Sequence, residues 1–212
     1  QQTITVNLGP TAWVISPRFG ESYSFDHAGR LLSLFVDGQS CQRALDHRIV
    51  TRGSATRPRR ELPPDRAAAL LAHVFDDLGA LRDDIPALEL APDQARDLAA
   101  ALDTILAFGP ARLAADGAEF RRLYRPVSIL PPDQYLALVL QATEGCSWNR
   151  CTFCTLYRDR PFRIHNPDSF RAHCAGVRDF FGAGISLRRG IFLADANALI
   201  IPQKRLLALV RI

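Results

Sequence analysis

The sequence predicts an α/β protein in which the first half of a TIM-like (β/α) barrel follows a small α+β extension. Two continuous apolar runs of strand length, residues 135–142 and 190–194, are typical of strands buried on both faces of a parallel sheet. Each run is followed by a loop and a helical pattern, the first over 167–181 and the second from Pro202 onward. A repeat of strand, loop and helix is the unit of a barrel or a doubly wound sheet.

Residues 1–60 are expected to form a strand-rich antiparallel meander. Candidate strands at 21–25, 31–36, 41–45 and 47–51 are separated by turn-forming segments that contain Asp and Gly. This part of the sequence contains no recognisable catalytic constellation.

Residues 61–130 are expected to form a helical extension and linker. After a Pro/Arg-rich linker at 54–64, apolar spacing predicts a helix over 65–78 that ends at Gly79, and a second helix from Pro92 to the Gly109-Pro110 pair. A Pro-rich connection then leads into residues 131–212, the partial barrel. We place a domain boundary at that connection.

The bulk composition is ordinary for a soluble globular protein, with 212 residues, 48% hydrophobic and 23% charged, and a net charge of +4. No apolar run approaches the ~20 residues of a membrane-spanning helix, and no secretory signal is visible, so we expect no membrane partner. The odd, clustered cysteines favour a reducing compartment, so we expect a cytoplasmic protein. Arginine clusters at 52–60 and 150–163 are compatible with a nucleic-acid partner, but solvated Arg-rich faces explain them more simply.

The chain begins at Gln1 and contains no Met, which favours a fragment of a longer protein. Two strand–helix units cannot close a barrel, so we expect the barrel to be truncated at its C-terminus and the fragment to be inactive alone.

The cysteines favour a metal site over disulfides, because the count is odd and three lie within nine residues. Cys146, Cys151 and Cys154 follow the first barrel strand, at the strand end where active sites of such folds lie. Thiolates suit zinc and iron–sulfur clusters. Three thiolates would leave one iron of a four-iron cluster open. Cys41 is expected to be a lone core thiol.

The run 145–154, Gly-Cys-Ser-Trp-Asn-Arg-Cys-Thr-Phe-Cys, resembles the radical S-adenosylmethionine (SAM) superfamily, in particular Elp3/MiaB-like and related uncharacterised branches. The usual spacing between the cysteines is three residues and then two, with an aromatic residue before the third. Here the spacing is four and then two, with Phe153 in the aromatic place. The resemblance covers about 135–212.

The resemblance implies that Cys146, Cys151 and Cys154 bind a [4Fe–4S] cluster whose fourth iron is chelated by SAM. Reduction by a reductase, flavodoxin or ferredoxin then cleaves SAM to methionine and a 5′-deoxyadenosyl radical, which abstracts a substrate hydrogen. Phe153 would pack near the adenine of SAM. Asp195, where the superfamily often carries a Gly-Gly-Glu-like motif, would accept a hydrogen bond from the SAM amino group. The residues present do not identify the substrate.

Alternatives remain for these residues. A zinc ion could use the three cysteines with His165, His173 or Cys174 as a fourth ligand. The alternative function is a non-catalytic zinc- or iron–sulfur-binding module that associates with RNA, in view of the basic net charge. Asp195 could instead cap a helix. The basic residues after the third Cys could bind an anion or pair with acids such as Asp159; these are Arg158, Arg160 and Arg163.

Overall fold

The computed structural model describes residues 4–53 and 58–212 and shows a mixed α/β protein. Residues 54–57, the start of the predicted Pro/Arg-rich linker, lie outside the described residues. The chain divides into two compact units, the first up to Ala118 and the second from Glu119 to Ile212. The division differs from the three predicted segments, because the strands of 1–60 and the helices of 61–130 share one core.

The first unit contains a six-stranded antiparallel sheet in which each strand pairs with the next along the chain. The strands are β1 (Thr5–Leu8), β2 (Trp13–Ser16), β3 (Ser22–Phe25), β4 (Leu31–Val36), β5 (Gln39–Arg43) and β6 (Ile49–Thr51). The last four lie where strands were predicted, whereas β1 and β2 were not predicted. On β3, Tyr23 and Phe25 are buried while the serines beside them are partly exposed, as the two-residue period of a strand requires.

The turn between β3 and β4 is fixed by its own side chains. The Asp26 Oδ1 atom accepts hydrogen bonds from the backbone N–H groups of Ala28, at 2.9 Å, and Arg30, at 3.0 Å. Gly29 has a φ of +87°, and a Cβ atom there would lie 2.6 Å from the backbone oxygen of Thr104. Only glycine therefore fits this turn.

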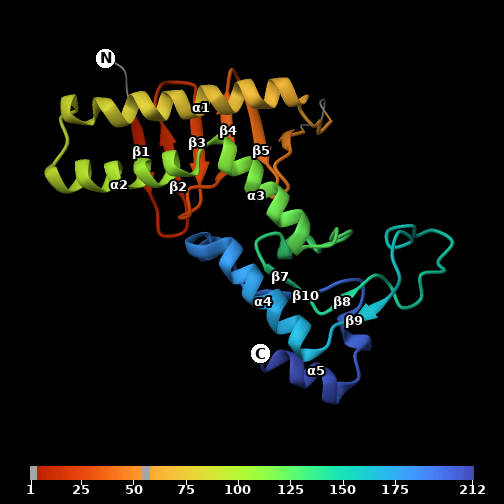
Figure 1. The fold of residues 1–212 in the computed structure, drawn as a ribbon. Helices are drawn as coiled ribbons and strands as arrows, with labels where there is room; N and C mark the ends of the chain where they lie inside the picture. The colour runs from red at the N-terminus through yellow and green to blue at the C-terminus, as the bar shows by residue number, and fades with distance from the viewer. Residues whose placement is uncertain (1–3, 54–57) are drawn as a thin grey trace. The chain divides into compact units, whose positions relative to one another are not determined.

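Helices α1 (Pro64–Asp84) and α2 (Pro92–Phe108), joined through the short 3-10 helix η1 (Ile85–Ala87), lie along one face of the sheet (Figure 1). The predicted end of the first helix at Gly79 was wrong. The helix continues because Leu81, and Ile85 just beyond it, add to the buried apolar face, which outweighs the ~1 kcal/mol that an interior glycine costs. Helix α2 ends before Gly109, as predicted.

Helix α3 (Pro110–Leu123) was not predicted, and its first half is held by a buried ion cluster. Asp116 accepts hydrogen bonds from Arg30 Nε at 2.8 Å and from Arg43 Nη2 at 3.0 Å. Both arginines project from the sheet region, so the cluster links α3 to the sheet. A sequence pattern does not reveal such a pairing, because its members are up to 86 residues apart.

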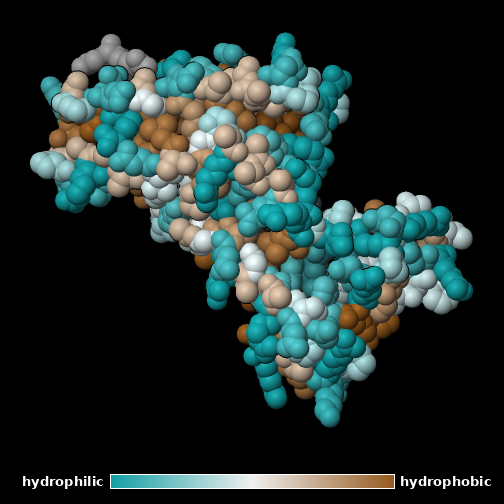
Figure 2. Space-filling model, viewed as in Figure 1, coloured by the Kyte–Doolittle hydropathy of each residue, from teal (hydrophilic) through white to brown (hydrophobic). Residues whose placement is uncertain are grey.

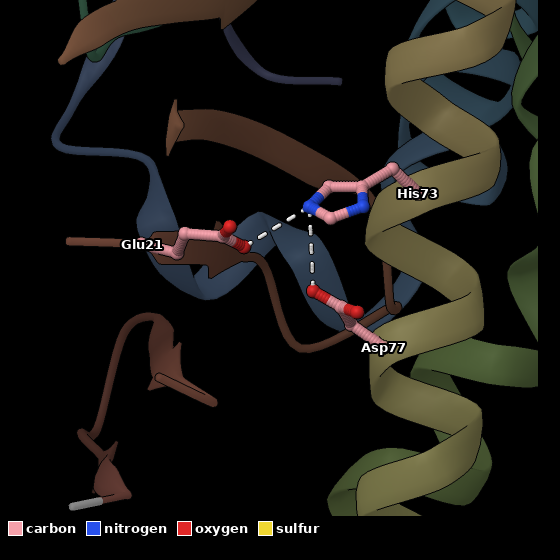
Figure 3. Close-up of side chains that lie close together, drawn as sticks. All are labelled: Glu21, His73 and Asp77. Carbon is pink, nitrogen blue, oxygen red and sulfur yellow. Dashed lines mark hydrogen bonds and ion pairs between the residues drawn. The ribbon is translucent and has the colours of Figure 1, made fainter. Parts of the chain in front are cut away.

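Helix α1 also presents two polar side chains, one turn apart, toward the segment that precedes β3. These are His73 and Asp77, which face Glu21 (Figure 3).

The second unit contains a parallel pair of strands, β7 (Leu138–Gln141) and β10 (Ile191–Ala194), with Leu138 opposite Ile191 and Gln141 opposite Ala194. Both lie within predicted strands, but β7 begins three residues later than expected because 135–137 form a turn. Between them runs α4 (Pro167–Phe181), as predicted, packed against β7. The 3-10 segments are η2 (Pro132–Gln134), η3 (Gly182–Leu187) and η4 (Ala198–Ile200), and α5 (Gln203–Val210) comes last.

A short antiparallel pair, β8 (Thr143–Glu144) and β9 (Arg163–Ile164), was not predicted. It joins the two ends of the segment that contains the three clustered cysteines. The segment therefore leaves and re-enters the unit at one place.

No single helix in the described ranges is long and apolar enough to cross a membrane, although the bent pair α2–α3 passes the same test of length and composition. Figure 2 shows hydrophilic side chains over most of the viewed face, with apolar atoms in a band between α1 and α2 and in smaller patches on the second unit.

Candidate functional site

The candidate site lies at the C-terminal ends of the two parallel strands. Gln141 of β7 is in register with Ala194 of β10, so the segments that follow them leave the same edge of the pair. The cysteine loop follows β7 and β8, and Asp195 follows β10 directly. The structure thus brings Asp195 beside the start of the loop, which is where sequence reasoning expected it.

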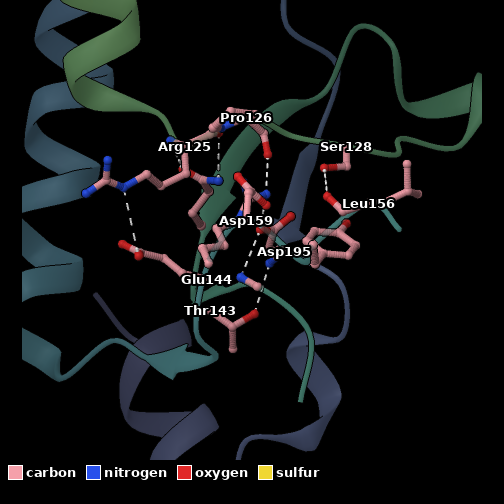
Figure 4. Close-up of polar contacts among 12 residues, drawn as sticks. Arg125, Pro126, Ser128, Thr143, Glu144, Leu156, Asp159 and Asp195 are labelled. Atoms are coloured by element: carbon pink, nitrogen blue, oxygen red, sulfur yellow. Dashed lines mark hydrogen bonds and ion pairs between the residues drawn. The ribbon is translucent and has the colours of Figure 1, made fainter. Parts of the chain in front are cut away.

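Asp195 is held tightly at this edge, with its side chain fully buried (Figure 4). Its Oδ2 atom accepts hydrogen bonds from the Gly145 N–H and from Arg160 Nη2, both at 3.1 Å. Its own N–H donates to Thr143 Oγ1 at 3.0 Å. The Oδ1 atom is buried and has no hydrogen-bond partner among the residues that the structure describes. One carboxylate oxygen therefore fixes the loop, while the other is buried without a well-formed hydrogen bond, as is the hydroxyl of Tyr157, which acts on the same carboxylate.

Burial raises the pKa of Asp195, while the Gly145 amide and the Arg160 guanidinium oppose that rise. Nearby, burial raises the pKa of Tyr157 to about 12, and the Asp195 carboxylate acts in the same direction. Tyr157 is therefore a neutral phenol at physiological pH. The helix-capping alternative for Asp195 is not what the structure shows, because Asn197 caps η4 instead, accepting from the Leu199 N–H at 3.1 Å.

The Arg160 side chain connects several parts of the loop and its surroundings. Besides Asp195, its side chain contacts the backbone oxygen of Pro126 at 2.6 Å and Asp159 Oδ2 at 2.9 Å. The guanidinium lies 5.2 Å from the centre of the Tyr157 ring. Of the two roles that the sequence left open for this arginine, the structure shows pairing with acids.

The loop begins at a position that demands glycine. Gly145 has a φ of +73°, and a Cβ atom there would lie 3.0 Å from the Pro161 oxygen. Inside the loop, Asn149 Nδ2 donates to the Tyr157 oxygen at 2.9 Å, and the Asn149 N–H points to Cys146 Sγ at 3.4 Å. Arg158 donates to the Cys151 oxygen at 3.0 Å. The loop is thus folded on itself by polar contacts.

The three loop cysteines are half-buried and carry free thiols. Within the described ranges, the one group of three potential ligand atoms that lies within 4.8 Å is formed by Glu21, His73 and Asp77, not by the cysteines. The loop thiols therefore do not surround a position for a single ion. A four-iron cluster binds each thiolate through a different iron, which spreads the sulfurs farther apart. Cys41 is buried on β5, which confirms the expected core thiol.

Two aromatic side chains of the loop are largely exposed, whereas Tyr157 is buried. Phe153 is 90% exposed and Trp148 is 66% exposed. Phe153 was expected to pack beside the adenine of SAM. Its ring makes little contact with the other described residues and is accessible to a bound molecule.

The residues considered as a fourth zinc ligand have other partners. His173 Nε2 accepts the Gln141 N–H at 3.1 Å, and burial together with His165 lowers the His173 pKa to about 4. His165 lies between Ser169 Oγ, at 3.2 Å, and Glu144 Oε1, at 3.3 Å. Burial raises the pKa of the Cys174 thiol. None of these three side chains is placed as the fourth ligand of a zinc ion bound by the loop cysteines.

The sequence analysis did not predict two contacts of Asp195. The Gly145 N–H donates to the Asp195 carboxylate, and the Thr143 hydroxyl accepts the Asp195 N–H. The unusual Gly before the first Cys was the available signal. Comparisons of this chain with protein-family models, curated proteins and solved structures found no match.

Proposed function

We propose that this protein is a radical SAM enzyme of unassigned substrate, in which Cys146, Cys151 and Cys154 bind a [4Fe–4S] cluster. The observation that carries the proposal is the convergence of two features at one strand edge. Three free thiols lie on the loop after β7, and the carboxylate of Asp195, with one unpartnered oxygen, lies at the end of β10. Active sites of parallel α/β folds form at this edge.

The donor set fits such a cluster better than a closed zinc site. The donor set consists of three thiolates, which are soft ligands. Of the neighbouring histidines, His173 accepts a backbone N–H and His165 contacts the Glu144 carboxylate. When bound, the cluster and SAM would supply the 5′-deoxyadenosyl radical for hydrogen abstraction. We further propose a (β/α) half-barrel as the framework, on the basis of the β7–α4–β10 unit and the α5 helix that follows it.

The chain's own residues have defined tasks in this proposal. Gly145 and Arg160 hold Asp195 Oδ2, so that Oδ1 keeps a fixed position and can accept a hydrogen bond from an ammonium group such as that of SAM. Tyr157 and Asn149 keep the loop folded, and exposed Phe153 is free to stack on an adenine ring. A cytoplasmic reductase, flavodoxin or ferredoxin would provide the electron.

Anaerobic reconstitution with iron and sulfide tests the proposal. The chain should take up about four irons and four sulfides, show broad visible absorption, and give an EPR signal after reduction that changes when SAM is added. Cys146→Ala, Cys151→Ala and Cys154→Ala should each abolish these signals, whereas the matched control Cys174→Ala should retain them. Stoichiometric zinc in place of iron, or equal effects of all four variants, would refute it.

A second candidate is a non-catalytic metal-binding module that associates with RNA. It is favoured by the exposed Trp148 and Phe153 next to exposed Arg150 and Arg158, because aromatic rings and arginines together bind single-stranded bases and phosphates. Salt-dependent binding of single-stranded RNA by a chain whose reconstituted metal centre gives no spectral change with SAM would favour this candidate over the enzyme.

A further inference from the structure

A second cluster of potential metal ligands lies in the first unit, far along the sequence from the cysteines. His73 and Asp77 project from one face of α1, four residues apart, and Glu21 projects toward them from the segment before β3 (Figure 3). The His73 Nε2 atom lies 3.1 Å from Glu21 Oε2 and 3.5 Å from Asp77 Oδ2.

These separations suit a single metal ion. Ligand atoms about 2.1 Å from a tetrahedral ion lie about 3.4 Å from one another, which is close to both measured separations. The three ligand atoms all lie within 4.8 Å of one another. One imidazole nitrogen and two carboxylates form a donor set that suits Zn²⁺, Mn²⁺ or Fe²⁺.

The residues around the cluster favour a bound cation. Tyr23, fully buried, contacts both Glu21 and Asp77 through its hydroxyl, 2.8 Å from Asp77 Oδ2. The phenol has one hydrogen to donate, so it can orient one of the two carboxylates at a time. The carboxylates are largely buried, with side-chain exposures of 11% and 10%. Such a pair of anions needs a nearby positive charge.

Arg18 supplies that charge in the present structure. Its guanidinium pairs with Asp77, and its Nη1 atom lies 3.7 Å from Glu21 Oε1. The Arg18 side chain is 39% exposed, so it can move into solvent without being buried elsewhere. A metal ion bound by the cluster would therefore displace this guanidinium from the two carboxylates.

The cluster also opens to solvent. Arg18, Glu21 and His73 line one side of a cavity of about 670 Å³, whose other walls come from the β4–β5 turn and the first turns of α1. An ion held by three protein ligands would keep a coordination position on the cavity side for water or a small anion.

We propose that Glu21, His73 and Asp77 bind a divalent transition-metal ion such as Zn²⁺, and that Arg18 takes the place of the ion when no metal is bound. This site is independent of the cysteine loop and of the proposed radical chemistry. The three-ligand arrangement leaves it open to an exchangeable water.

Cobalt titration of the full chain separates this site from the cysteines, because thiolate ligands add a near-ultraviolet charge-transfer band that nitrogen and oxygen ligands lack. With the loop cysteines replaced by Ser, the chain should still bind one Co²⁺, with weak visible bands only, and Zn²⁺ should displace it. His73→Ala and Asp77→Asn should each weaken Zn²⁺ binding at least tenfold. The matched control Asp76→Asn removes an exposed charge from the same helix and should leave affinity within twofold.

Arg18→Gln provides the decisive test, since it leaves all three ligands in place. If Arg18 competes with the ion, the variant should bind Zn²⁺ about tenfold more tightly and gain more thermal stability from the metal than the parent chain. A purely structural ion-pair cluster predicts a less stable variant with no metal binding. That result, or equal Zn²⁺ affinity in the parent chain and His73→Ala, would overturn the proposal.

Discussion

Replacing Asp195 by Asn tests whether the carboxylate anchors the candidate site. Asn has nearly the same shape and can still accept the Gly145 N–H, but it carries no charge to balance Arg160. The Asp195 side chain is fully buried and that of Arg160 is 9% exposed, so their ion pair is shielded from water.

The size of the effect follows from that burial. Removing one partner of a buried pair costs about 3–5 kcal/mol, because the other charge stays buried without compensation. Arg160 keeps Asp159 and the Pro126 oxygen as partners, so we expect a smaller loss, about 2–3 kcal/mol. For a unit of fewer than 100 residues, this corresponds to a fall in Tm of about 10 °C or more.

Urea denaturation followed by circular dichroism measures the change, and hydrogen exchange at the Gly145 amide reports it locally. Asp179→Asn is the matched control. It removes the same charge from α4, where Asp179 pairs with Arg178 at 3.1 Å and both side chains are exposed. Exposed pairs contribute at most about 1 kcal/mol. Equal losses in the two variants, or an unchanged exchange rate at Gly145, would refute the anchoring role.

Two further predictions concern stability. Asp116→Asn should destabilise the first unit by about 3–5 kcal/mol in urea denaturation, because it leaves the guanidinium groups of Arg30 and Arg43 buried without their shared counter-charge. A loss below 1 kcal/mol would show that Asp26, 3.5 Å from Arg30, suffices. The second prediction concerns pH. The folded state lowers the pKa of His173 to about 4, so the unfolded chain binds a proton at this imidazole more tightly than the folded chain does. The contribution of neutral His173 to the free energy of unfolding is therefore complete above pH ~6.5 and is lost as the pH falls toward 4. The loss should reach about 2–3 kcal/mol in denaturation curves and should be absent in His173→Gln, which cannot be protonated; parallel pH curves for the two proteins would contradict it.

Local patterns in the sequence were enough to predict the two parallel strands and the helices α4 and α5 of the second unit. The strands β7 and β10 are apolar runs, and α4 carries Phe170, Val177 and Phe181 at helical spacing between an Asn cap and a glycine stop. These signals lie within a few residues of one another, so they can be read without knowing the fold. The strand β1 was missed because Thr5–Leu8 is short, lies at the edge of the sheet and is only partly buried.

Contacts between distant residues could not be predicted in the same way. The position of Asp195 one strand away from the cysteines was predictable, because successive parallel strands place their ends on one edge. Its fixation by Arg160 was not, since that depends on how an irregular loop folds back over 35 residues of sequence. The group of Glu21, His73 and Asp77 was not predicted either, because Glu21 is distant in sequence from the other two. The sequence shows only a His and an Asp four residues apart on a predicted helix.

The two oxygens of Asp195 explain how one side chain can serve both the fold and a ligand. Had Arg160 and Gly145 bound different oxygens, an incoming ammonium group would have had to displace one of them and loosen the loop. Instead both donors bind Oδ2, and Oδ1 stays unpartnered within the described chain. An unpaired buried carboxylate oxygen costs free energy, so a donor that reaches it should bind and also stabilise the folded loop. On this reasoning, the proposed binding of SAM and the order of the cysteine loop would be coupled through a single carboxylate.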